Sequence, residues 1–326
     1  MMQAIELARM GEGLTRPNPP VGAVLVRDEE IIAEGWHQSA GGPHAEVDCL
    51  QTVVGDLGHA TLYITLEPCS THGKTPPCTD LILEKGVGRV VVSVVDLNPK
   101  HAGKGLEILK ESGVEVVSGV CEEAGRELIA PFEKFITTGM PYVTLKLAST
   151  LDGKIADSEG NSKWITGSEA REKVQAMRRR ADAIMVGAAT VRADDPSLLP
   201  RPAEGRKPHR IVVGSNVPSN AKVLIDDAAE RTRVRQGSLR AILKELAEQH
   251  DVMHVFCEGG GKLAAGLIDE NLVDEFAFFI APKLMGADGL PNFAKIGGLI
   301  GDATPLVFRS VEQVGNDILI KATREK

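Results

Sequence analysis

The chain has 326 residues and a formal net charge of −8, with 43% hydrophobic and 25% charged residues. This length and composition predict a globular protein of two domains, each able to bury its own core. The negative charge disfavours a nucleic-acid binder, and we find no apolar run of signal-peptide or membrane-spanning type.

The first part of the chain alternates strands with helices, which predicts a sheet covered by helices, of α/β class. One helix contains Pro131 and ends at Gly139, and a new strand starts at Tyr142. We therefore place a domain boundary near Met140, giving domains 1–139 and 140–326. Strands are expected at 21–28 and 31–38 (a hairpin), 60–68, 89–96 and 114–119, and helices at 1–13, from about 44, and at 78–86, 104–113 and 122–139.

The second part repeats the alternation of strands and helices. Thr166 and Glu169 form a capping-box pattern at the start of a helix. The stretch 201–210 reads as a surface loop, and a glycine turn at 259–261 joins a strand to a helix. Strands are expected at 142–150, 181–190, 209–215, 252–260 and 274–286, helices at 166–182 and 238–250, and a closing strand pair at 306–315 and 317–324.

Two short stretches contain candidate metal ligands. "GGPHAEV" supplies His44 and Glu46, and "TLEPCSTHGKTPPC" supplies Cys69 and Cys78. One nitrogen and two sulfurs suit a catalytic zinc site, which leaves a fourth position for water. His44 and Cys78 stand where helices should begin, and a helix N-terminus favours a thiolate. Glu46 is then the spare carboxylate that moves protons, as in zinc deaminases, although the two cysteines stand further apart than in Pro-Cys-x-x-Cys.

Other interpretations of these residues stay open. His72 could be a fourth ligand of a structural zinc site, or the three residues could pack in a core. With five irregularly spaced cysteines and no export signal, reduced thiols in the cytoplasm are expected. Cys49, Cys121 and Cys257 lie in apolar patterns and are predicted to be buried.

Six stretches together resemble one family. "RPNPPVGAVLV", "GGPHAEV", "TLEPCSTHGKTPPC", "DLNPKHAGKG", "KLASTLDGKIA" and "VRADDPSLL" occur in this order over nearly the whole chain. They resemble the bifunctional deaminase/reductase family of riboflavin biosynthesis, usually called RibD or RibG. The resemblance implies a cytidine-deaminase-like α/β/α domain with Zn²⁺, followed by a dihydrofolate-reductase-like α/β domain with NADPH. It implies deamination of 2,5-diamino-6-ribosylamino-4(3H)-pyrimidinone 5′-phosphate, then reduction of its ribosyl group to a ribityl chain.

The same resemblance implies site residues. In the deaminase, Glu46 is the proton shuttle, the zinc ligands are His44, Cys69 and Cys78, and the substrate contacts are Asn18, His37 and Lys74. The reductase substrate contacts are Lys146, Ser162, Arg178, Leu198, Arg201 and Glu258. The cofactor contacts are Ala148, Trp164, Thr190, Asp194, Ser215 and the segment Gly260, Gly261, Lys262, Leu263, Ala264, Ala265 and Gly266.

Several alternatives remain at this point. From sequence alone Trp164 could be a core residue, and Arg178–Arg180 a solvated helix face. A nucleic-acid base deaminase would need a basic, aromatic channel, but aromatic residues make up only 4% of the chain. A zinc-stabilised binding protein, or a deaminase with an inert second domain, is also possible. A homo-oligomer that acts on a phosphorylated pyrimidine, without a nucleic-acid or membrane partner, is expected.

Overall fold

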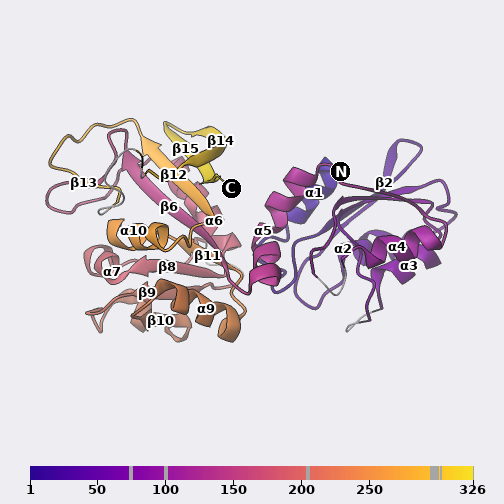
Figure 1. The fold of residues 1–326 in the computed structure, drawn as a ribbon, viewed down its shortest axis with the longest axis horizontal. Helices are drawn as coiled ribbons and strands as arrows, with labels where there is room; N and C mark the ends of the chain where they lie inside the picture. Colours follow the sequence, from indigo (N-terminus) through magenta and orange to yellow (C-terminus); the bar gives the residue numbers. More distant parts are fainter. Residues whose placement is uncertain (73–75, 99–101, 203–205, 294–300, 302, 326) are drawn as a thin grey trace. The chain divides into compact units, whose positions relative to one another are not determined.

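The computed structural model describes residues 1–72, 76–98, 102–202, 206–293, 301 and 303–325. The chain divides into two compact units, Met1–Gly139 and Met140–Lys326. Figure 1 shows a sheet with flanking helices in each unit. Within the described residues, no helix is long and apolar enough to cross a membrane.

The N-terminal unit is built on a five-stranded sheet of order β2-β1-β3-β4-β5. The β1 strand pairs antiparallel with β2 and β3, whereas β3, β4 and β5 run parallel. The strands are β1 (Gly22–Arg27), β2 (Glu30–Trp36), β3 (Thr61–Leu66), β4 (Arg89–Val94) and β5 (Glu115–Ser118). The helices are α1 (Met2–Arg9), α2 (Ala45–Leu50), α3 (Cys78–Glu84), α4 (Lys104–Glu111) and α5 (Glu122–Thr138).

Two apolar clusters attach these helices to the sheet. The larger cluster joins strands β1, β3 and β4 to α2, α3 and α4, with Leu25, Ile64 and Val92 fully buried. The smaller cluster joins the same sheet to α1 and α5 through Ala8, Leu128 and their neighbours. Burial of these side chains fixes the starts of α2 and α3 beside the end of β3.

The C-terminal unit is built on an eight-stranded sheet of order β10-β9-β8-β11-β6-β12-β15-β14. Its strands run parallel from β10 to β12, and β15 and β14 add to the edge in antiparallel fashion. The main strands are β6 (Tyr142–Thr150), β8 (Ala183–Gly187), β9 (His209–Val213), β10 (Thr232–Arg235), β11 (His254–Cys257), β12 (Glu275–Ala281), β14 (Leu306–Val314) and β15 (Asp317–Arg324). A separate pair joins β7 (Lys154–Ala156) to β13 (Leu290–Pro291).

Apolar clusters cover this sheet as well. One cluster packs α9 and α10 on the sheet through residues such as Leu243 and Leu267, and another packs α6 and α7 through Val174 and Val191. The helices are α6 (Ser168–Arg180), α7 (Ala188–Asp194), α8 (Lys222–Ile225), α9 (Leu239–His250) and α10 (Gly261–Asp269), with a 3₁₀ turn η1 (Ala229–Arg231).

The structure confirms the α/β class and most of the predicted elements, but four local predictions are wrong. The capping box is absent, because α6 begins after Gly167 without a side-chain cap. Cys121 is exposed rather than buried, since it takes a left-handed conformation at the start of α5. Arg210, the last residue of the stretch 201–210 that was expected at the surface, lies in the predicted strand β9 and is fully buried, because Asp226 neutralises it. The strand predicted at 181–190 becomes helical from Ala188.

Candidate functional site

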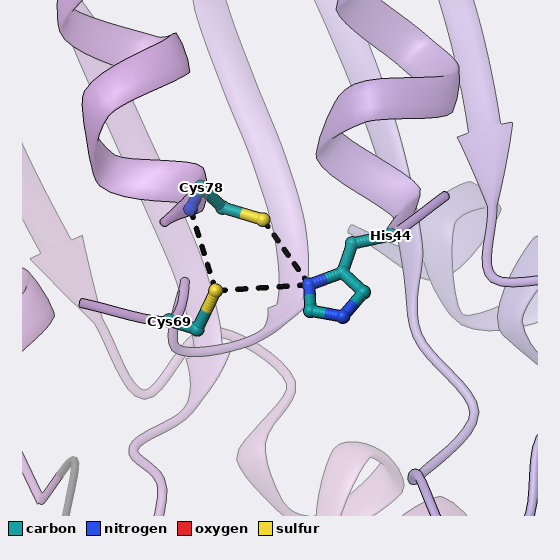
Figure 2. Close-up of side chains that lie close together, drawn as sticks. All are labelled: His44, Cys69 and Cys78. Atoms are coloured by element: carbon teal, nitrogen blue, oxygen red, sulfur yellow. Dashed lines mark hydrogen bonds between the residues drawn. The ribbon is translucent and has the colours of Figure 1, made fainter. Parts of the chain in front are cut away.

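Three elements of the N-terminal unit bring one imidazole and two thiols together. His44 is the residue before α2, Cys69 lies in the loop after β3, and Cys78 is the first residue of α3. Figure 2 shows the three side chains pointing toward a common centre. Their ligand atoms all lie within 4.8 Å of one another.

The distances fit a tetrahedral metal site. The Nδ1 atom of His44 lies 3.3 Å from Sγ of Cys78 and 3.7 Å from Sγ of Cys69. With Zn–N and Zn–S bonds of about 2.0 and 2.3 Å, tetrahedral ligand atoms lie about 3.5–3.8 Å apart. The backbone N–H of Cys78 also donates to Sγ of Cys69 over 3.3 Å. Hydrogen bonds with Cys78 and His44 lower the pKa of the Cys69 thiol, which favours the thiolate that a metal needs.

Glu46 lies in the first turn of α2, two residues beyond His44, and is 4% exposed. Burial raises the pKa of its carboxyl group to about 7. A buried carboxyl group beside the ligand cluster, but outside it, is available for proton transfer rather than for metal binding.

The structural-zinc interpretation lacks its fourth ligand. His72 is exposed, and among the described residues the clustered metal-binding side chains are His44, Cys69 and Cys78, without His72. A set of three ligands leaves one position of a tetrahedron open, which is the arrangement of a catalytic zinc site.

A cavity of about 190 Å³ opens beside these ligands. Glu46 and two predicted substrate contacts, Asn18 and His37, line it. Lys74, the third predicted contact, lies outside the described residues. Among the lining residues that sequence reasoning missed are Glu67, Asp96, Asn98 and Phe132. The position of Glu67 and Asp96 just after strand ends was the available signal, because such positions border sites in α/β sheets.

The contacts of His37 orient Asn18. Nδ1 of His37 lies 2.7 Å from the carbonyl oxygen of Pro43, which can only accept, so Nδ1 carries the proton. Burial lowers the pKa of His37, which favours the neutral ring. Nε2 then accepts from the amide nitrogen of Asn18 over 3.0 Å. This leaves the amide oxygen of Asn18 to accept a hydrogen bond from a ligand.

In the C-terminal unit, predicted residues gather at the carboxyl ends of parallel strands. Ala148 lies near the end of β6, Thr190 follows β8, Ser215 follows β9 and Glu258 follows β11. These strands are neighbours in the sheet, so their carboxyl ends share one edge. Ligands of open α/β sheets bind at such an edge.

Three charged side chains meet there from three elements. Arg178 on α6 forms a bidentate ion pair with Glu258. Its Nε donates to Oε1, and its Nη2 donates to Oε2 over 2.9 Å. Lys146 on β6 is close enough for its charge to interact with both groups, and burial lowers its pKa. Arg178 is therefore part of a charged cluster, not of a solvated helix face.

A glycine turn precedes α10. Gly259 and Gly260 have positive φ values of 40° and 131°. The hydroxyl of Thr190 donates to the carbonyl oxygen of Gly259 over 2.9 Å, and a Cβ atom at Gly260 would lie 3.2 Å from that hydroxyl oxygen. The turn thus places glycines, without side chains, directly before the N–H groups of α10, as in phosphate-binding helix starts. Of the predicted segment that follows, Gly261, Lys262 and Gly266 lie on α10, and the side chains of Leu263, Ala264 and Ala265 are buried.

The remaining predicted contacts occupy loops and helix ends. Trp164 is 62% exposed, so it is not a core residue, and its ring packs on Arg171. Asp194 pairs with Lys163, and Ser215 accepts from Arg192 through its carbonyl oxygen. Ser162 stands in the same loop as Trp164, Leu198 is buried, and the backbone of Arg201 is bonded to Gln175 on α6.

Two family models match the chain, one in each unit. Residues 1–94 match the cytidine and deoxycytidylate deaminase zinc-binding region, and residues 141–320 match the RibD C-terminal domain. The riboflavin biosynthesis protein RibD of Aquifex aeolicus is 42% identical, over 98% of this chain and 96% of the relative. That of Escherichia coli K12 is 37% identical, over 98% and 97%.

Solved structures are similar over the full length. Acinetobacter baumannii RibD (form 1) superposes with a TM-score of 0.91 at 37% identity, covering 100% of this chain and 98% of that one. A diaminohydroxyphosphoribosylaminopyrimidine deaminase/5-amino-6-(5-phosphoribosylamino)uracil reductase from Thermotoga maritima gives 0.90 at 40% identity, covering 100% and 97%.

Proposed function

The chain belongs to the RibD family, the bifunctional deaminase/reductases of riboflavin biosynthesis, and on this premise we propose which domain and which residues carry each of the two reactions. The N-terminal domain, 1–139, carries the zinc-dependent deamination, and the C-terminal domain, 140–326, carries the NADPH-dependent reduction. Their folds are those expected, a cytidine-deaminase-like domain followed by a dihydrofolate-reductase-like domain. The observation that carries the first assignment is the convergence of His44, Cys69 and Cys78 beside buried Glu46.

His44, Cys69 and Cys78 would hold the zinc ion, because their spacing and chemistry fit a tetrahedral site with one open position. When bound, zinc supplies Lewis-acid chemistry that lowers the pKa of water to about 7. Glu46 takes a proton from the attacking water and passes it to the leaving amine, which departs as ammonia. The ring carbon gains an oxygen and loses a nitrogen, with no change in oxidation state.

The substrate is the diaminopyrimidinone ribosylamine phosphate. Asn18 accepts from a ring or amino N–H through its amide oxygen, since His37 holds its amide nitrogen. Lys74, which lies outside the described residues, is proposed to meet the phosphate, because a compact cation suits that group.

For the reductase we propose that the glycine turn at Gly259–Gly260 and the start of α10 hold the NADPH pyrophosphate. NADPH supplies a hydride when bound, and the protein supplies binding and orientation. Lys146, Arg178 and Glu258 hold the phosphorylated substrate at the same edge of the sheet. The further cofactor contacts proposed are Ala148, Trp164, Thr190, Asp194 and Ser215, and the further substrate contacts are Ser162, Leu198 and Arg201.

A homo-oligomer in the cytoplasm stays part of this proposal. Edge strand β14 carries the exposed apolar side chains Phe308 and Val311, which a second copy of the chain would cover. All five cysteines are free, which suits a reducing compartment. Light scattering of the purified protein measures the oligomeric state directly.

Replacing Glu46→Gln tests the deaminase assignment. The variant removes the proton carrier but keeps all three proposed ligands, so we expect bound zinc to stay at the wild-type level. Ammonia release from the diaminopyrimidinone phosphate should fall by about 10²–10⁴-fold. Ammonia release and zinc content are measured on the same preparation. The reductase activity is followed separately, as NADPH oxidation with the deaminated substrate.

The matched control is Glu84→Gln, the same chemical change at an exposed position on α3. It should deaminate like the wild type. Normal ammonia release from the Glu46 variant would remove Glu46 from the mechanism, and wild-type protein that binds no zinc would overturn the whole assignment.

A further inference from the structure

The side chain of Glu67 is a second buried carboxyl group beside the deaminase cavity, in addition to Glu46, and the proposed mechanism does not use it. It follows β3 directly, two residues before Cys69, and is 5% exposed. Its oxygens accept from three backbone N–H groups, those of Asp96 at 3.1 Å, Gly103 at 2.9 Å and Gly105 at 2.9 Å.

Two of the donors, Asp96 and Gly103, belong to the connection between β4 and α4, and the third, Gly105, lies in the first turn of α4. Oε2 accepts from Asp96 and Gly103, and Oε1 accepts from Gly105, so both oxygens are engaged. These backbone donors satisfy both oxygens of the buried side chain in place of the water that it loses. One side chain therefore holds both ends of the connection.

The close approach of this connection depends on glycine. A Cβ atom at Gly105 would lie 2.3 Å from the carbonyl oxygen of Pro68 and 3.2 Å from Oε1 of Glu67. Gly103 takes a positive φ of 86° just before α4. A side chain at position 105 would therefore push the start of α4 away from Pro68 and Glu67, and Gly103 takes a backbone conformation that favours glycine.

The same connection lines the cavity. Asp96 and Asn98 are part of the cavity wall, together with Asn18, His37 and Glu46. The carboxylate of Asp96 accepts from the N–H of Asn98 over 2.8 Å, which links the two wall residues. The position of this wall depends on where Glu67 holds the backbone of Asp96.

We propose that Glu67 is a positioning residue of the deaminase, which fixes the Asp96–Asn98 wall against the substrate through its three backbone hydrogen bonds. The proposal rests on the proposed deaminase function. Glu67 acts on substrate binding and not on the proton transfer, because its oxygens are occupied by the connection. It is also not a member of the metal-ligand group found among the described residues.

The test is Glu67→Gln, which keeps the side-chain size but turns one acceptor oxygen into an NH₂ group facing backbone N–H donors. We expect KM for the diaminopyrimidinone phosphate to rise about 10–100-fold while kcat changes by less than about threefold. Zinc content should be unchanged. Hydrogen exchange at the amides of Asp96, Gly103 and Gly105 should accelerate at least about tenfold, without a change in the strands.

The matched control is Glu107→Gln, the same change at an exposed position in the first turn of α4. It should have the KM of the wild type and the same hydrogen exchange rates at the amides of Asp96, Gly103 and Gly105. Gly105→Ala is the second variant, because it disturbs the same contact from the backbone side while the carboxylate stays intact. It should also raise KM with zinc retained.

The outcomes separate this inference from the proposed function. A wild-type protein that does not deaminate overturns the function itself. If the wild type deaminates but Glu67→Gln keeps a wild-type KM, or loses zinc or kcat instead, Glu67 does not position the wall. Should Glu67→Gln fail to fold, Gly105→Ala decides: a normal KM in that variant overturns the proposal.

Discussion

At the scale of single residues, the pairing of Arg178 with Glu258 is the basis of the proposed substrate site of the reductase. The guanidinium and carboxylate are mostly buried and joined by two hydrogen bonds. A buried charge without its partner is costly, so each member holds the other in its charged form. Lys146 adds a second cation, which gives the trio a net positive charge suited to a substrate phosphate.

Replacing Arg178→Ala should impair reduction and spare deamination. The change removes one of the two cations and leaves Glu258 buried beside Lys146. We expect kcat/KM for NADPH-dependent reduction to fall about 10²–10³-fold, by the loss of a charge-assisted contact and its geometry. Ammonia release and NADPH oxidation are measured separately, with the deaminated substrate supplied for the second.

Arg180→Ala provides the comparison, since Arg180 is exposed near the end of the same helix. It should leave both activities unchanged. If Arg178→Ala abolishes both activities, the variant has damaged the fold, and if it abolishes neither, Arg178 does not touch the substrate.

At the scale of secondary structure, the position of α2 depends on a glycine in β2. A Cβ atom at Gly35 would lie 2.3 Å from the backbone nitrogen of Cys49 and 2.6 Å from the carbonyl oxygen of Ala45. Both contacts are to the α2 backbone, which cannot move without the whole helix. The helix starts directly after His44 and carries Glu46 in its first turn, so its displacement would move a metal ligand and the proton carrier together.

Gly35→Ala should therefore weaken zinc binding as well as stability. Overpacking of this kind costs about 1–3 kcal/mol, and we expect a lower unfolding temperature together with reduced zinc content. Gly187→Ala is the control, because a Cβ atom there meets no atom within 4 Å and its φ is −78°. That variant should retain zinc and ammonia release. Full zinc occupancy in Gly35→Ala would show that α2 can shift without disturbing the ligands.

The helices and strands also show how much of the fold could be predicted from the sequence. Strands with dense β-branched residues, such as β4, and helices that end at glycine, such as α5, were predictable because the signal is local. The start of α6 was not, because the Thr166–Glu169 spacing is a weak pattern and the helix begins two residues later. The burial of Arg210 was not predictable either, since its charge is neutralised by a tertiary partner, Asp226, 16 positions away.

The residues of the candidate site likewise divide into those that could be predicted from the sequence and those that could not. The zinc ligands and Glu46 could be proposed because zinc chemistry demands particular side chains at particular spacings. The role of Glu67 could not, because its partners are backbone N–H groups 29 to 38 residues further on, which carry no side-chain signature. Contacts of this type follow from the fold and not from local composition.

At the scale of the whole molecule, the chain joins two units that each have their own sheet and core clusters. The proposed zinc ligands all belong to the N-terminal unit, and the proposed NADPH contacts all belong to the C-terminal unit. A ligand stabilises the unit that binds it by mass action. The two halves should therefore respond separately to removal of their ligands.

Zinc removal should lower one unfolding transition and leave the other in place. A ligand at 100–1,000 times its Kd contributes about 2.7–4.1 kcal/mol to the folded state. At roughly 2–4 °C per kcal/mol for a unit of this size, chelation should lower the N-terminal transition by about 5–15 °C in calorimetry. Ammonia release should disappear, whereas NADPH oxidation with the deaminated substrate should persist, and added zinc should restore the first transition and its activity. NADPH should raise only the second transition. If chelation moves both transitions equally, the two units unfold as one body, and the independence inferred from their separate cores is wrong.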